Sequence, residues 1–150
     1  MSKTSYYNYN KLYNVVVENF DDQSRPTTST PPPSTPPSTP PIDLPSKDPT
    51  VWGPHAWKLF HIMAENYPEN PSPIYKIKAT EFIRSIPFMI PCEKCSIHAM
   101  KFIDEREDKI INIVSSRSNL ANFFVDFHNY VNARYGKKIY TYEEARNLYK

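Results

Sequence analysis

The sequence predicts an all-α fold, a small four-helix bundle with a short fifth helix, confined to the last two thirds of the chain. Apolar residues recur there at spacings of three and four, as they do on one face of an α-helix. Proline, glycine and capping residues stand where these periodic segments begin and end. No segment shows the clear alternation of apolar and polar residues that is typical of a β-strand.

Residues 1–50 are predicted to be a disordered tail and residues 51–150 a single folded domain. After a lead rich in tyrosine and asparagine, ten of the 16 prolines lie between Pro26 and Pro49, among many serines and threonines. Such a stretch buries too little apolar surface to offset the entropy lost on ordering, so we expect an extended spacer. The next hundred residues hold 16 of the 21 aromatic side chains, enough for one small core.

The first two predicted helices are bounded by prolines. The first helix runs from Trp52 towards Pro68, which is expected to end it. The second helix begins near Pro73, and Pro87 is expected to stop it after Ile86. The periodic residues are Trp52, Ala56, Phe60, Met63 and Tyr67, with Trp57, His61 and Ala64 beside them, in the first helix, and Ile74, Ile77, Phe82, Ile83 and Ile86 in the second.

The third predicted helix follows an apolar connection, residues 88–90, and has Pro91 in its first turn. It ends near Ile103, and a mostly polar stretch, residues 104–117, comes next. Four apolar residues of this stretch are expected to turn inward: Ile110, Ile111, Ile113 and Val114.

Two further helices complete the predicted bundle. Helical spacing resumes from Leu120 to Tyr135, and Gly136 is expected to close this fourth helix in the left-handed conformation. Thr141 and Glu144, three residues apart, form a capping-box pattern that predicts a short fifth helix.

Charge and hydropathy exclude several classes of protein. The chain has a formal net charge of +2. Residues 51–150 carry 14 basic and 11 acidic side chains, without the basic stripe that binding to nucleic acid needs. No apolar run approaches the ~20 residues of a membrane span, and the N-terminus lacks the apolar stretch of a secretory signal. We therefore expect no nucleic-acid or membrane partner, and a cytoplasmic location.

Cys92 and Cys95, the only two cysteines, form a C-x-x-C motif. Pro91 is expected to place both in the first turn of the third helix, with Cys92 the more exposed. Unpaired backbone N–H groups and the helix dipole favour a thiolate there, and a thiolate is the nucleophile of disulfide exchange. A structural disulfide framework would need more cysteines, and a thioredoxin-like motif would lie in a βαβ unit. The pair is therefore either redox-active or metal-binding.

Zinc binding is the alternative to redox chemistry. It would need two further ligands, for which His61, His98 and His128 are the candidates. The chain would then be a non-enzymatic zinc-binding helical interaction module. Most structural zinc sites have a second C-x-x-C or a close histidine pair, and the sequence shows neither, so no metal is predicted.

Aromatic and polar side chains also pair at helical spacing. Trp57 and His61 lie one turn apart on the first helix, and His128 and Asn132 one turn apart on the fourth. Each pair alone is typical of a satisfied helical core. Together with His98 they would line a pocket for a flat aromatic ligand, with a lysine at position 137 to meet a phosphate.

These motifs resemble those of the flavin-linked sulfhydryl oxidases of the Erv/ALR type. Four places agree in order, spacing and identity: residues 52–57 (WGPHAW) through His61, residues 67–68 (YP), residues 91–95 with His98, and residues 128–132 (HNYVN) with Lys137. The likeness spans residues 51–149. The tryptophan before glycine and the compact size are most similar to the versions carried by large DNA viruses.

The resemblance implies FAD at the mouth of a four-helix bundle, and usually a homodimer. It implies that Cys95 lies against the flavin ring and that Cys92 meets the substrate. Tyr149 stands where cellular members often have a tryptophan near the adenine. The residues that would bind FAD by this likeness are Trp52, Gly53, Trp57, His61, Tyr67, Cys95, His98, His128, Asn129, Val131, Asn132, Lys137 and Tyr149.

The resemblance further implies a thiol oxidase that makes disulfides in substrate proteins and reduces oxygen to hydrogen peroxide. A thioredoxin-like carrier is one candidate substrate, and the host cytoplasm or the virion is the implied location. Cellular members have a long-range disulfide at the positions of Val125 and Tyr142, and a second, mobile cysteine pair. This sequence has neither, so we expect substrates to reach Cys92 directly.

Overall fold

The computed structural model describes residues 45–149, and this part of the chain is helical, without a strand. The predicted all-α bundle is confirmed there, whereas most of the predicted tail, residues 1–44, lies outside the described residues. The helices are α2 (Pro49–Glu65), α3 (Pro73–Met89), α4 (Glu93–Asp104), η1 (Glu107–Lys109), α5 (Ile110–Ile113), α6 (Arg117–Arg134) and α7 (Tyr142–Leu148).

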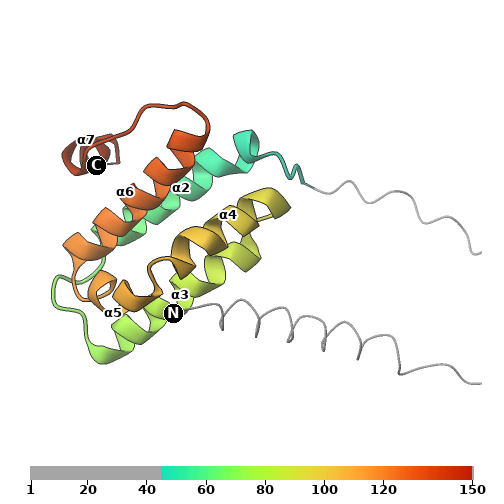
Figure 1. Cartoon of the computed structure of the whole chain (residues 1–150). Helices are drawn as coiled ribbons and strands as arrows, with labels where there is room; N and C mark the ends of the chain where they lie inside the picture. Colours follow the sequence, from blue (N-terminus) through green and yellow to red (C-terminus); the bar gives the residue numbers. More distant parts are fainter. Residues whose placement is uncertain (1–44, 150) are drawn as a thin grey trace, which may run out of the picture. The chain divides into compact units, whose positions relative to one another are not determined.

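The four long helices pack as two pairs, α2 beside α6 and α3 beside α4 (Figure 1). Stacked aromatic rings join α2 to α6 and link the two pairs to one another. Phe60 of α2 lies over Phe124 of α6, with ring centres 5.3 Å apart, and Phe102 of α4 lies over Phe127 of α6 at 4.7 Å. Because aromatic side chains bury large areas and gain from ring contacts, this layer stabilises the bundle strongly.

Four helix ends meet at one end of the bundle, which we call the cysteine end because α4 begins there. Figure 1 shows the start of α2, the end of α3, the start of α4 and the end of α6 gathered at this end, with α5 at the opposite one. The cysteine pair therefore lies at the end of the bundle where these helix ends gather.

Capping residues explain several boundaries. Thr141 and Glu144 form the predicted capping box of α7, and Gly136 has the predicted left-handed conformation, with φ of 61°. Asp48 caps α2 by accepting from the backbone N–H of Thr50 at 2.8 Å. The domain boundary predicted after residue 50 thus falls inside the first turn of α2.

Two boundaries lie a few residues from their predicted positions. α6 begins at Arg117, before the predicted start at Leu120, because Ser116 supplies an N-cap. α2 ends at Glu65, so Asn66 and Tyr67 separate the end of the helix from Pro68, the residue predicted to end it.

The prediction that Pro87 stops the second helix is wrong. α3 continues through Pro87 to Met89, so the predicted connection of residues 88–90 shrinks to Ile90. Proline removes one backbone donor from a helix. Here it stands in the last turn and is buried, so packing of its ring offsets the lost hydrogen bond.

The inward orientation predicted for Ile111 is also wrong. Ile110, Ile113 and Val114 are buried, but Ile111 is 71 % exposed. Residues 110–113 form the short helix α5, which the sequence did not predict, and successive helical residues point about 100° apart. For the same reason two isoleucines of α3, at positions 74 and 77, face outward.

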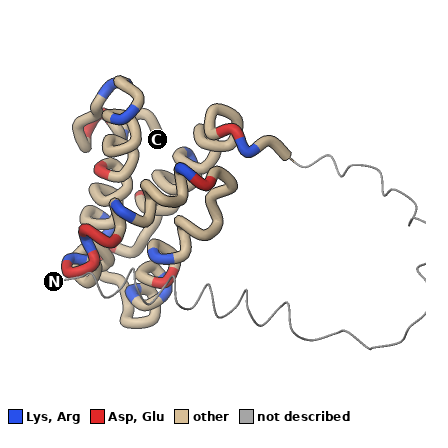
Figure 2. Tube along the Cα trace, turned by 45° about the vertical axis from the view of Figure 1, so that its right-hand side comes forward, with Lys and Arg blue, Asp and Glu red and all other residues tan. Residues whose placement is uncertain are grey.

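Charges are spread over the bundle without a stripe of one sign, as Figure 2 shows for the described residues. Within residues 45–149, no helix combines the length and apolar character that crossing a membrane requires.

Candidate functional site

The C-x-x-C pair forms a disulfide at the start of α4. Cys92 is the N-cap, and its Sγ accepts a hydrogen bond from the backbone N–H of Cys95 at 3.2 Å. The prediction that both cysteines lie within the first turn needs correction, because Pro91 precedes the cap and only Cys95 is helical. Both side chains are half-buried, so greater exposure of Cys92 is not evident. The helix start still supplies N–H groups and a dipole that favour negative charge on sulfur.

His98 follows Cys95 by one turn and connects α4 to α6. Its Nε2 contacts the guanidinium of Arg134. Because a guanidinium has only donors, Nε2 accepts this bond and the ring proton lies on Nδ1. Burial, with the positive charges of Arg134 and Lys101, lowers the pKa of His98. The contact with Arg134 therefore sets the ring tautomer of His98, one turn after Cys95.

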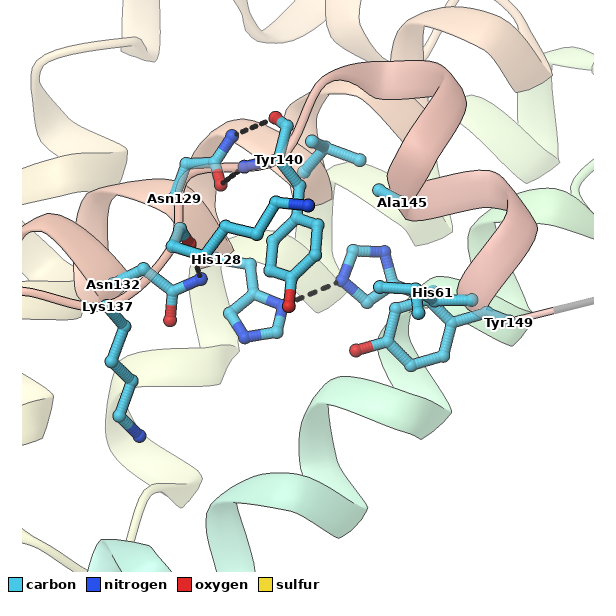
Figure 3. A pocket seen from close by; sticks show the side chains of 11 residues that line it. His61, His128, Asn129, Asn132, Lys137, Tyr140, Ala145 and Tyr149 are labelled. Carbon is cyan, nitrogen blue, oxygen red and sulfur yellow. Dashed lines mark hydrogen bonds between the residues drawn. The ribbon is translucent and has the colours of Figure 1, made fainter.

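A cavity of about 210 Å³ lies between α2, α6, α7 and the segment that joins the last two helices (Figure 3). Six of the residues predicted to bind FAD line it: His61, His128, Asn129, Asn132, Lys137 and Tyr149. Five others line it that the sequence did not single out as ligand contacts: Val125, Lys138, Tyr140, Ala145 and Leu148.

Two stacked ring pairs meet at this cavity. Trp57 lies parallel to His128, with ring centres 4.2 Å apart, and His61 lies parallel to Tyr149 at 4.3 Å. His61 Nε2 and His128 Nδ1 are 3.1 Å apart, so one nitrogen donates and the other accepts (Figure 3). Burial lowers the pKa of both histidines to about 4, and the charges of His61 and Lys137 add to the effect at His128.

We expect the stability of the fold to decrease as the pH falls from 6.5 to 4. In this window the unfolded chain binds protons at His61 and His128, whereas the folded chain does not, so protonation favours unfolding. Below pH 4 this contribution is fully lost, and above 6.5 it is fully present. Denaturant unfolding at pH 7 and pH 4.5 measures the effect. His61→Gln should weaken the pH dependence of the unfolding free energy, whereas His55→Gln, at an exposed position, is the control and should leave it unchanged. An equal loss of stability between pH 7 and pH 4.5 in the wild type and in both variants would contradict this assignment.

Two asparagines of α6 hold the segment that follows Gly136. The side chain of Asn129 donates to the Tyr140 carbonyl at 2.8 Å and accepts from the Tyr140 N–H at 3.0 Å. Asn132 donates to the Lys138 carbonyl at 3.0 Å. These amides thus form one wall of the cavity by fixing its backbone, a role that spacing on a helix could not reveal.

Three other predicted residues do not line the cavity. Trp52 donates from Nε1 to the Lys47 carbonyl at 3.1 Å. Gly53 is buried, yet a Cβ added there would meet no atom within 4 Å. Val131 is half-buried against the core. Gly53 therefore leaves open space beside α2, one turn before Trp57.

Tyr67 is not brought to the cavity. It lies just beyond the end of α2, is buried, and donates from its hydroxyl to the Val114 carbonyl at 3.1 Å. Arg117 donates to the carbonyl of Tyr67 at 2.7 Å. Its observed contacts fasten the end of α2 to the segment before α6.

The ligand set of a zinc site is not assembled in the described part of the chain. No group of three or more histidine, cysteine, aspartate or glutamate side chains gathers there. His61 and His128 bond to each other, His98 contacts Arg134, and the two sulfurs are bonded together.

Comparison with known proteins decides the family. The model of the Erv1 / Alr family matches residues 54–150. The chain belongs to the Erv1/Alr family. The resemblance seen in the sequence motifs is thereby confirmed.

Erv1/Alr relatives of this chain include viral proteins. It is 41 % identical over 106 residues to a putative FAD-linked sulfhydryl oxidase of Invertebrate iridescent virus 6. The aligned segment covers 69 % of this chain and 96 % of that protein. It is 36 % identical over 97 residues to a probable FAD-linked sulfhydryl oxidase of Acanthamoeba polyphaga mimivirus, covering 65 % and 67 %. The similarity to viral versions is confirmed.

The Erv1/Alr fold is also found in a solved structure. The crystal structure of the yeast Erv1 core matches with a TM-score of 0.64 and 25 % identity, over 81 % of this chain and 97 % of that one. The bundle described above is therefore the family's fold.

Proposed function

We propose that this chain is an FAD-linked thiol oxidase, which makes disulfide bonds in substrate proteins and transfers the electrons to oxygen, releasing hydrogen peroxide. The observation that carries the proposal is the Cys92–Cys95 disulfide at the start of α4, in a chain similar to named FAD-linked sulfhydryl oxidases. We further propose reduced proteins as substrates, a thioredoxin-like carrier among them, and the host cytoplasm or the virion as the location, since relatives of this chain are viral.

The cavity fits one end of FAD. Its stacked rings suit a flat aromatic group, and the ammonium of Lys137 suits a phosphate. At about 210 Å³ it is smaller than the roughly 300 Å³ of the smallest usual ligand pockets, so the rest of the cofactor must lie outside it. We propose that the adenine end lies near Tyr149 and that the flavin end extends towards Cys95, with the open space beside Gly53 available to it.

The chain's own residues perform the thiol chemistry. A substrate thiolate attacks Sγ of Cys92, the new S–S bond forms there, and the bond to Cys95 breaks with its electron pair on Sγ of Cys95. A second substrate thiol then attacks the mixed disulfide and releases Cys92. The helix start stabilises the thiolates, and Arg134 holds the ring of His98 one turn further along α4. Bound FAD supplies the two-electron acceptor that returns the cysteine pair to the disulfide.

A second copy of the chain is proposed to pack on the exposed face of α2. Val51, Leu59, Ile62 and Met63 lie on this face at helical spacing and are all more than a third exposed. An apolar stripe of this kind is typical of a helix that packs against another surface. A homodimer would cover this stripe.

Oxygen and peroxide measurements test the electron acceptor. We expect one hydrogen peroxide to form for each dithiol oxidised in air, and turnover to stop when oxygen is removed. Dithiol oxidation that proceeds at the same rate without oxygen, or that yields no peroxide, would contradict the proposed acceptor. Omitting the enzyme gives the background rate.

A further inference from the structure

We propose that the exposed end of α3 is a docking surface for apolar segments of substrate proteins that present a cysteine to Cys92. The surface consists of Phe88 and Met89. The side chain of Met89 is 80 % exposed and that of Phe88 is 48 % exposed, although both are large and apolar. The inference rests on the proposed thiol oxidase function and deepens it by naming the class of substrate.

The docking surface adjoins the reactive sulfur. Met89 precedes Cys92 by three residues, so their Cα atoms are at most about 11 Å apart, even for a fully extended chain. Ile90 packs against the core, and Cys92 caps α4. The connection between α3 and α4, residues 90–92, is therefore held at both of its ends. A protein whose thiolate reaches Sγ of Cys92 therefore comes within reach of Met89.

The chemistry of this surface favours apolar partners. Three charged residues lie within five positions of this surface: Arg84, which pairs with Glu107, and Glu93 and Lys94, which carry opposite charges. Burial of an exposed methionine or phenylalanine by an apolar group is favourable, whereas a polar group would lose hydration there. Cysteine is among the residues most often buried in folded proteins, so cysteines become accessible to an enzyme mainly in unfolded or partly folded chains, in which future core residues are exposed as well. Unfolded or partly folded proteins with such cysteines are the proposed substrates.

A second copy of this chain is a poorer occupant of the docking surface. A copy seated there would cover Cys92 and hinder every substrate. The exposed stripe on α2 offers a larger apolar face for self-association. We therefore assign the end of α3 to substrates.

Competition between two synthetic dithiol peptides of equal length and charge tests this assignment. One has leucine beside each cysteine and the other has serine. With the full-length chain in its FAD-bound form, we expect kcat/KM to be about tenfold higher for the leucine peptide, an effect within the range for burying one apolar side chain. Met89→Gln should remove most of this preference, and Met89→Leu should keep it. Ile111→Gln, at a similarly exposed apolar position on α5, is the matched control and should leave the preference unchanged.

Dithiothreitol, a small dithiol with no apolar side chain to dock, separates this inference from the proposed function on which it rests. All three variants should oxidise it at the wild-type rate. If the wild type fails to oxidise it, the proposed function is wrong. If the wild type oxidises it but does not distinguish the peptides, or if Met89→Gln keeps the preference, the docking surface is wrong. Dissociation of a dimer by Met89→Gln would show that a second copy covers this face and would also overturn the inference.

Discussion

Replacing Cys92 or Cys95 by serine is expected to abolish oxidation of a small dithiol, leaving only the rate without enzyme. The two residues are the only cysteines of the chain, and either replacement removes the disulfide that a substrate thiolate must attack. Cys92→Ser should still bind FAD, because Cys92 is the residue assigned to the substrate. Oxygen uptake with dithiothreitol, together with the flavin absorbance of each purified variant, measures both properties.

Ser96→Ala is the matched control for these variants. Ser96 lies on the same turn of α4 as Cys95, and its replacement removes a hydroxyl without affecting a thiol. It should retain near wild-type turnover. Full activity of either cysteine variant would show that the electrons do not pass through this pair.

His128→Ala is expected to remove most of the stabilisation that FAD gives to the fold. At a free FAD concentration of ~100 times its dissociation constant, binding adds about 2.7 kcal/mol to the wild type, roughly 10–20 °C in Tm for a domain of this size. The alanine variant loses the ring that stacks on Trp57 and leaves the buried His61 without its hydrogen-bond partner. Its stability without FAD should therefore also fall, by about 1–3 kcal/mol. Melting curves with and without FAD separate the two effects.

Ile83→Val controls for general destabilisation. Ile83 is fully buried in α3 and does not line the cavity, and its truncation should cost about 1 kcal/mol while keeping the full rise in Tm with FAD. An equally large rise in His128→Ala would mean that this histidine serves only the core and that the cavity does not hold the cofactor.

Helical periodicity and capping residues were enough to predict most of the fold. The capping box at Thr141 and the left-handed Gly136 are local signals, and the structure has both. The end predicted at Pro87 is wrong because the sequence shows only the local effect of proline, the loss of one backbone hydrogen bond. The packing that offsets this loss depends on the other helices. The inward orientation predicted for Ile111 is wrong because α5 has only four residues, too few to show a helical period in the sequence.

The site could be predicted in part, through chemically distinctive residues at helical spacing. His61 and His128 were identified singly, but their mutual hydrogen bond joins residues 67 positions apart and leaves no pattern in the sequence. Tyr140 and Lys138 were missed for a related reason. They reach the cavity because Asn129 and Asn132 hold their backbone, and such amide contacts depend on the tertiary fold.

The visible absorption spectrum of the purified full-length chain, recorded without oxygen before and after adding dithiothreitol, tests the central claim most directly. The account predicts a yellow protein with the absorbance of bound flavin, which the dithiol bleaches in the wild type through the Cys92–Cys95 pair. A colourless protein that contains one zinc ion per chain, or a flavin absorbance that the dithiol leaves unchanged, would contradict it.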